Sequence, residues 1–160
     1  MIEIKKAFQN ITADEFNELL DVPVWLSLLA AYEGDGIISE NEKAEAVKLA
    51  HMRTYTAPKS LQEFYRLVDG RFAQRFEQLD HRLPTDIENK KVYIRAQVHH
   101  ANDLLNKLDL DIASGLQKSL ASFYKHVFNS DKSFFQYFAL PVFSNRLDKH
   151  SGKINLGSKK

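Results

Sequence analysis

The chain has 160 residues, a length typical of one domain, and its 44% hydrophobic and 27% charged residues are ordinary for a globular protein. The absence of cysteine excludes thiol catalysis, cysteine-bound metal centres and disulfides. The 22 Lys and Arg residues nearly balance 21 Asp and Glu residues, so the net charge of +1 argues against a dedicated nucleic-acid-binding protein.

Two helices are predicted near the N-terminus. Thr12 and Glu15 match a capping box, in which each side chain binds the other residue's backbone N–H, and this box opens a short helix that ends near Leu20. Pro23 suits the first turn of a second helix that runs to about Tyr32. The apolar run 22–32 falls short of the ~20 residues of a membrane span. Since residues 1–10 also lack the pattern of a secretory signal, we expect a cytoplasmic protein with no membrane span.

Two longer helices follow. A second capping box at 39–42 opens a helix that continues toward Thr54. Pro58 then breaks the chain and restarts it. Apolar residues spaced by three and four run from Leu61 to Leu83 and pass straight through Gly70. The spacing therefore predicts one long helix with a tolerated glycine.

The second half of the chain predicts three more helices. Residues 85–88 match a third capping box and open a helix over 87–108, and a further helix covers 112–127. A short aromatic helix at 134–138 precedes Pro141. We thus expect an all-α, single-domain irregular bundle of about seven helices over residues 1–143. Residues 144–160 read as a basic, flexible C-terminal tail.

The turn between the second and third helices carries residue types that bind metal. Residues 31–50 have a net charge of −3, more than half of the −5 of residues 1–80. A hard divalent cation such as Ca²⁺ or Mg²⁺ takes several oxygen ligands, and a glycine allows the sharp turn that aims them inward. The candidate ligands are Glu33, Asp35 and Glu42, with Gly36, Ile38 and Ser39 as the supporting loop, Ile38 docking it on the core. Ala31 occupies the first position of a calcium loop, where an acidic ligand belongs, so a high-affinity calcium site is not expected.

The same turn also has a purely structural interpretation. Glu42 completes the capping box of Ser39, and acidic residues in the first turn of a helix complement its dipole. The residues alone leave both interpretations open.

The pattern Asp35-Gly36, then Ile38-Ser39, then Glu42 at the start of a helix resembles the tellurite-resistance TerB-like family. It is also similar to the related N-terminal domain of DnaJ-like membrane co-chaperones. This resemblance implies an all-helical cytoplasmic domain with divalent-metal-binding acidic residues beside the turn. It also implies a stress-response or protein-interaction role.

Catalytic patterns are absent from the sequence. It contains no nucleophile elbow, phosphate-binding glycine loop or dinucleotide fingerprint. His99, His100 and Asp103 lie within one helical turn and could begin a metal site, although surface or interhelical hydrogen bonding is the more common role of such histidines. We therefore expect a non-catalytic protein.

A second hypothesis needs no metal. A cluster of aromatic residues in the C-terminal part includes Phe134, Phe135 and Phe138. If part of it is exposed, the chain is a scaffold or adaptor that docks a protein partner there; otherwise the cluster belongs to the core.

Overall fold

The computed structural model describes residues 6–34 and 36–128, and this part of the chain is all-helical, as predicted. Its six helices are α2 (Ala13–Leu20), α3 (Val22–Glu33), α4 (Glu40–Thr56), α5 (Lys59–His81), α6 (Ile87–Leu105) and α7 (Leu110–His126). Each matches a predicted helix. The seventh predicted helix, at 134–138, and the tail 144–160 lie outside the described residues.

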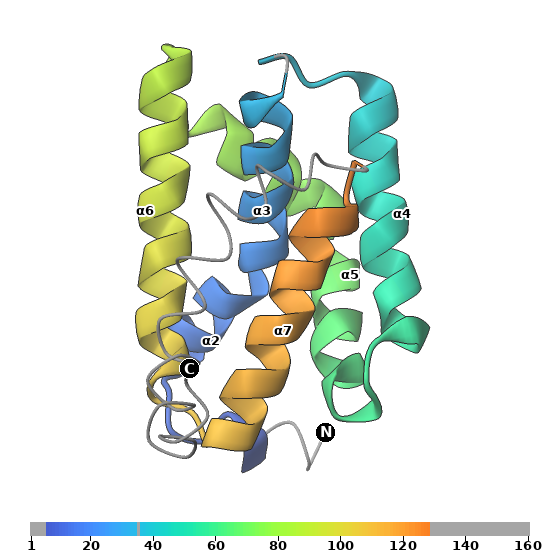
Figure 1. The fold of residues 1–160 in the computed structure, drawn as a ribbon, viewed down its shortest axis with the longest axis vertical. Helices are drawn as coiled ribbons and strands as arrows, with labels where there is room; N and C mark the ends of the chain where they lie inside the picture. The colour runs from blue at the N-terminus through green and yellow to red at the C-terminus, as the bar shows by residue number, and fades with distance from the viewer. Residues whose placement is uncertain (1–5, 35, 129–160) are drawn as a thin grey trace, which may run out of the picture.

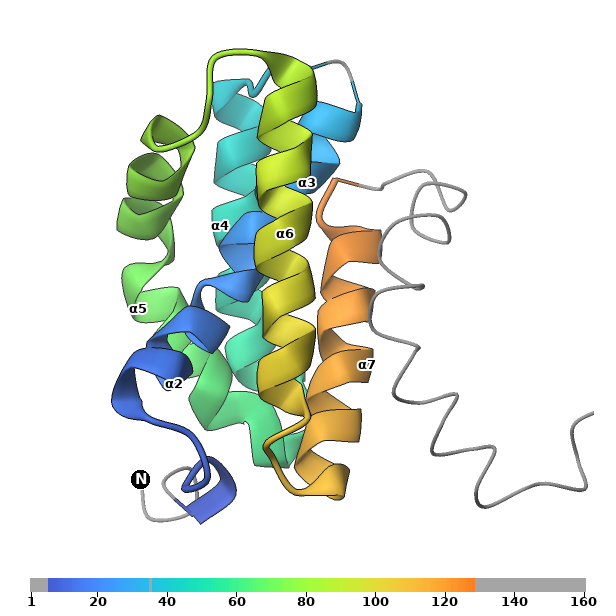
Figure 2. The ribbon, with the colours of Figure 1, turned by 90° about the vertical axis from the view of Figure 1, so that its left-hand side faces the viewer.

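The most apolar helix, α3, occupies the centre of the bundle (Figures 1 and 2). It packs against every other described helix, most extensively against α6 and also against α5 and α7. Ten of its twelve residues are buried, and a helix that is hydrophobic on all sides must be covered on all sides. The surrounding helices supply aromatic side chains to this core, among them the fully buried Phe64, Phe72 and Phe123.

Helices α4 and α5 form a closely packed antiparallel pair (Figure 1). Ala57 ends α4 in an extended conformation, and Pro58 is the N-cap residue of α5. Helix α5 continues through Gly70, as the spacing of its apolar residues predicts. A Cβ atom at Gly70 would meet nothing within 4 Å, so this glycine is tolerated rather than required.

The structure confirms two of the three predicted capping boxes. Thr12 with Glu15, and Ser39 with Glu42, make both reciprocal hydrogen bonds. The third box, at 85–88, is wrong: Asp86 is the N-cap residue, and its carboxylate accepts a 3.0 Å hydrogen bond from the Asn89 N–H. Threonine and aspartate are both good N-cap residues, so the sequence alone does not show whether Thr85 or Asp86 caps this helix. Helix α6 also ends at Leu105, three residues before the predicted end.

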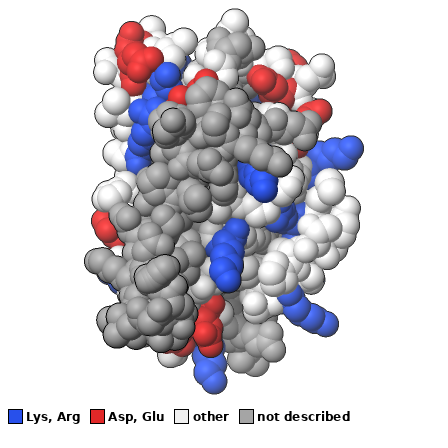
Figure 3. All heavy atoms as spheres, viewed as in Figure 1, with Lys and Arg blue, Asp and Glu red and all other residues white. Residues whose placement is uncertain are grey.

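On the face that Figure 3 shows, the charged side chains of the described residues follow no single-sign pattern. In Figure 3, basic and acidic side chains lie interspersed, and neither forms a continuous patch over the visible described residues. None of the described helices combines the length and apolar character that crossing a bilayer requires.

Candidate functional site

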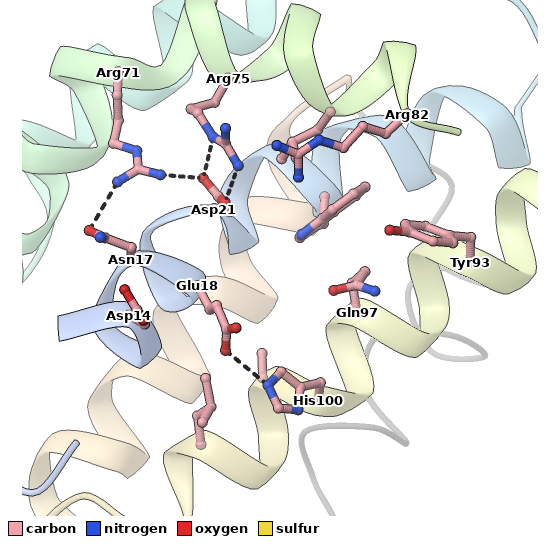
Figure 4. Close-up of a pocket in the computed structure, with 14 residues that line it drawn as sticks. Asp14, Asn17, Glu18, Asp21, Arg71, Arg75, Arg82, Tyr93, Gln97 and His100 are labelled. Atoms are coloured by element: carbon pink, nitrogen blue, oxygen red, sulfur yellow. Dashed lines mark hydrogen bonds and ion pairs between the residues drawn. The ribbon is translucent and has the colours of Figure 1, made fainter. Parts of the chain in front are cut away.

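A polar cleft of about 470 Å³ opens between α2, α3, α5 and α6 (Figure 4). Its volume lies within the range of small-molecule binding sites. The interior is lined in part by apolar side chains, including Trp25, Leu79 and Leu104, each at most 6% exposed. Charged and polar side chains from α2, α5 and α6 surround this apolar part. The cleft therefore combines a rigid base with several groups able to orient a ligand.

The residue that organises the cleft is Asp21, which alone separates α2 from α3. It is both the C-cap of α2 and the N-cap of α3, yet its side chain makes no capping hydrogen bond. Instead its carboxylate accepts hydrogen bonds from Arg71 Nη2 at 2.8 Å, from Arg75 Nε at 3.1 Å and from Arg75 Nη2 at 2.8 Å. The residue is only 7% exposed, so these charge-assisted bonds fix it and both arginines in place.

Three arginines form the α5 side of the cleft. Arg71 and Arg75 lie one turn apart on α5, and Arg82 follows directly after its last residue on the same face. Hydrogen bonding to Asp21 raises the pKa of Arg75. Arg75 also donates to Gln78 at 2.7 Å, and Arg71 to Asn17 at 3.2 Å.

These arginines keep unused donors. The Nε of Arg71 is buried and finds no acceptor among the described residues. The guanidinium of Arg82 makes no hydrogen bond or ion pair within residues 6–34 and 36–128, and Figure 4 shows it beside Arg75 at the edge of the cleft. Asp21 can neutralise only one of the two arginines that it binds. The α5 side of the cleft therefore carries net positive charge.

Helix α6 supplies the opposite side through Tyr93, Gln97 and His100, which share one helix face. In Figure 4 the Tyr93 hydroxyl and the Gln97 amide point from α6 toward the same space as Arg82. The Tyr93 ring packs on Trp25, with 5.8 Å between ring centroids. His100 Nε2 lies 2.9 Å from Glu18 Oε1 of α2 and joins the two helices at the other end of the cleft.

The predicted acidic turn is arranged differently. The side chain of Glu33 is only 5% exposed and forms ion pairs with Arg95 and, at 3.8 Å, with Lys91, both on α6. Glu42 binds the Ser39 backbone N–H at 3.1 Å, and its own N–H donates to Ser39 Oγ at 3.0 Å. Each of the two glutamates thus already has a structural role.

One glycine of the supporting loop has a backbone conformation that few other residues adopt. Gly36 has a φ of 79°, a left-handed conformation that favours glycine, and a Cβ atom there would lie 2.8 Å from Ile87 Cδ1 at the start of α6. Ile38 is partly buried against the core, as expected. Asp35 lies outside the described residues, so a cation site that includes it stays a prediction.

Other predicted site residues are not brought together as ligands. His100 pairs with Glu18, while His99 and Asp103 are exposed. Among the described residues no three His, Asp or Glu side chains are grouped so as to hold a metal ion. Phe134, Phe135 and Phe138 lie outside the described residues, so the aromatic docking surface also stays a prediction.

The cleft itself was missed in the sequence, although a signal for it exists. Arg71, Arg75 and Arg82, with Gln78 between them, repeat at four, three and four residues and therefore share one face of a helix. The residues on the other sides of the cleft come either from some fifty positions earlier in the chain or from positions after the arginines. No local sequence pattern predicts that these segments lie together.

Comparisons of the chain with protein-family models, with curated proteins and with solved structures find no match. The TerB-like resemblance stays a prediction that rests on residues 35–42. The geometry of the cleft is the remaining basis for a functional conclusion.

Proposed function

We propose that this chain is a non-catalytic binding module whose ligand site is the cleft between α2, α3, α5 and α6. The observation that carries the proposal is the arginine side of the cleft. There a buried carboxylate holds two guanidinium groups, while the buried Arg71 Nε has no acceptor and the Arg82 guanidinium makes no hydrogen bond among the described residues. A site preorganised in this way loses little entropy when a ligand binds.

The pairing of the charged groups supports binding rather than acid–base chemistry. The Asp21 carboxylate is occupied by Arg71 and Arg75, and Glu18 by His100. A general base needs a lone pair directed at a substrate proton, whereas the lone pairs of these carboxylates are directed at the neighbouring arginine and histidine side chains. Their role is to hold the walls of the cleft in position.

The chain offers its own probe for a test of this proposal. Trp25, the single tryptophan, lines the cleft, so its fluorescence reports on ligands that enter. We would screen neutral, cationic and anionic small molecules against the full chain. We expect at least one class to change the Trp25 emission in a saturable way.

A pair of matched variants shows where such a ligand binds. Gln97→Phe places a ring in the cleft, whereas Gln74→Phe makes the same change at an exposed position of α5. We expect Gln97→Phe to abolish the response and Gln74→Phe to preserve it. A screen in which no class responds, or in which both variants bind normally, would contradict the proposed function.

A further inference from the structure

Resting on the proposed function, we infer that the arginine end of the cleft binds an oxyanion, the phosphate or carboxylate group of a small ligand. The group would lie between Arg75 and Arg82 on one side and Tyr93 and Gln97 on the other. Arg75 belongs to α5, Arg82 is its C-cap residue, and the other two belong to α6; all four line the cleft (Figure 4).

The arginines already bind one carboxylate in this way. Asp21 receives both Nε and Nη2 of Arg75, the paired arrangement in which a guanidinium recognises a planar oxyanion. A guanidinium has five N–H groups, and those of Arg75 that bind Asp21 and Gln78 are three of them. Two N–H groups on the Nη atoms remain for an external acceptor.

Arg82 adds a further positive charge to the cleft, and Asp21 does not pair with it. Its guanidinium has no partner within the described residues, and Figure 4 shows it beside Arg75. Both guanidinium groups line the same cleft, and an anion between them gains charge-assisted hydrogen bonds from both. The geometry therefore favours an anion over a neutral ligand.

The opposite side of the site is suited to the same group. The Tyr93 hydroxyl and the Gln97 amide are neutral donors that approach an oxyanion without electrostatic repulsion. The Tyr93 ring also packs on Trp25, so a ligand with an apolar part beside its anionic group would contact aromatic surface. The acidic side chains Asp14 and Glu18 belong to the α2 end of the cleft, and Glu18 is bound to His100.

The test uses Trp25 emission of the full chain at low ionic strength, where charge screening is weakest. Inorganic phosphate and succinate are titrated separately, with sodium chloride at matched ionic strength as the blank. We expect saturable binding with a Kd of about 1 mM for at least one of the two, the affinity typical of a few charge-assisted hydrogen bonds. The tighter of the two shows whether the natural group is a phosphate or a carboxylate.

Two arginine variants decide whether the anion lies where we infer. Arg82→Gln removes the unpaired charge and should weaken binding at least about tenfold. Arg66→Gln is the matched control, because Arg66 lies on the same helix but is exposed and paired with Glu63 outside the cleft. It should leave the Kd unchanged. Thermal unfolding of both variants checks that their fold is intact.

The inference and the proposed function fail in different ways. If neither phosphate nor succinate changes the emission beyond the chloride blank, or if Arg82→Gln binds as tightly as the unmodified chain, the inference is overturned. If a neutral or cationic compound still binds and Gln97→Phe blocks it, the proposed function survives that failure. If no compound of any charge binds, both are overturned.

Discussion

The acidic turn at 33–42 and the arginine side of the cleft are both clusters of like charge, but Glu33 and Glu42 of the turn are paired within the fold, whereas the arginines of the cleft have donors to spare. In the turn, Glu33 is buried against cations of α6 and Glu42 closes its capping box. In the cleft, Arg71 and Arg75 share one carboxylate and Arg82 has no described partner. A cluster of charged residues in the sequence is therefore a weaker indicator of a binding site than the presence of unpaired charged groups in the folded chain.

The largest expected effect concerns Glu33. If this residue acts as a buried ion-pair partner, Glu33→Gln removes the buried negative charge that faces Arg95 and Lys91 and lowers the free energy of unfolding by about 3 kcal/mol. Urea denaturation in metal-free buffer measures this. The control is Glu45→Gln, an exposed change on α4, which should stay within about 0.5 kcal/mol. Equal stability of the two variants without metal would remove the structural role that we assign to Glu33.

A smaller effect separates the two interpretations of Glu42. As a capping residue it can be replaced by glutamine, which also fits the box, so Glu42→Gln should change stability by less than about 0.5 kcal/mol. Glu42→Ala removes the side-chain acceptor and should cost about 1 kcal/mol. Both are measured by urea denaturation with and without millimolar calcium or magnesium. A metal-induced stabilisation that Glu42→Gln abolishes would support a cation site instead.

The smallest effect is a pH dependence at Tyr124, on the inner side of the same ion-pair network. Burial, followed by the negative charge of Glu33, raises the pKa of the Tyr124 phenol. A raised folded-state pKa means that the stability is present below about pH 10, the pKa in the unfolded chain, and is lost as the pH rises above it. Tyr124→Phe should therefore lose less stability than the unmodified chain between about pH 9 and pH 11.

Thermal unfolding across this pH range provides the measurement. Tyr55→Phe serves as the control, because Tyr55 is 62% exposed. Parallel alkaline curves for all three proteins would argue against a buried, perturbed phenol beside Glu33.

Local signals predicted most of the fold because each depends on residues close in the chain. The boxes at Thr12 and Ser39, the break at Pro58 and the continuous helix through Gly70 all follow from spacings of three or four residues. At the start of α6 the sequence predicts Thr85 as the N-cap residue, but Asp86 has that role. Local signals are ambiguous where two neighbouring residues can both cap a helix.

The sites were less predictable because their partners are distant in sequence. Glu33 and Arg95 are 62 residues apart, and Asp21 and Arg75 are 54 apart. The sequence of the acidic turn revealed carboxylates of the kind that bind metal, but not the Lys and Arg side chains of α6 that pair with Glu33. The arginine face of α5 was visible as a repeat, yet it becomes one side of a cleft only because the fold places residues of α2 and α6 around the same space.

One measurement tests the contrast between the two regions most directly. Amide ¹H–¹⁵N spectra of the full chain are recorded during titrations with inorganic phosphate and, separately, with calcium. We predict that phosphate shifts the signals of cleft residues such as Asn17 and Gln97, while calcium leaves those of Gly36, Ser39 and Glu42 unchanged. Calcium-dependent shifts in the turn together with an unresponsive cleft would contradict the account.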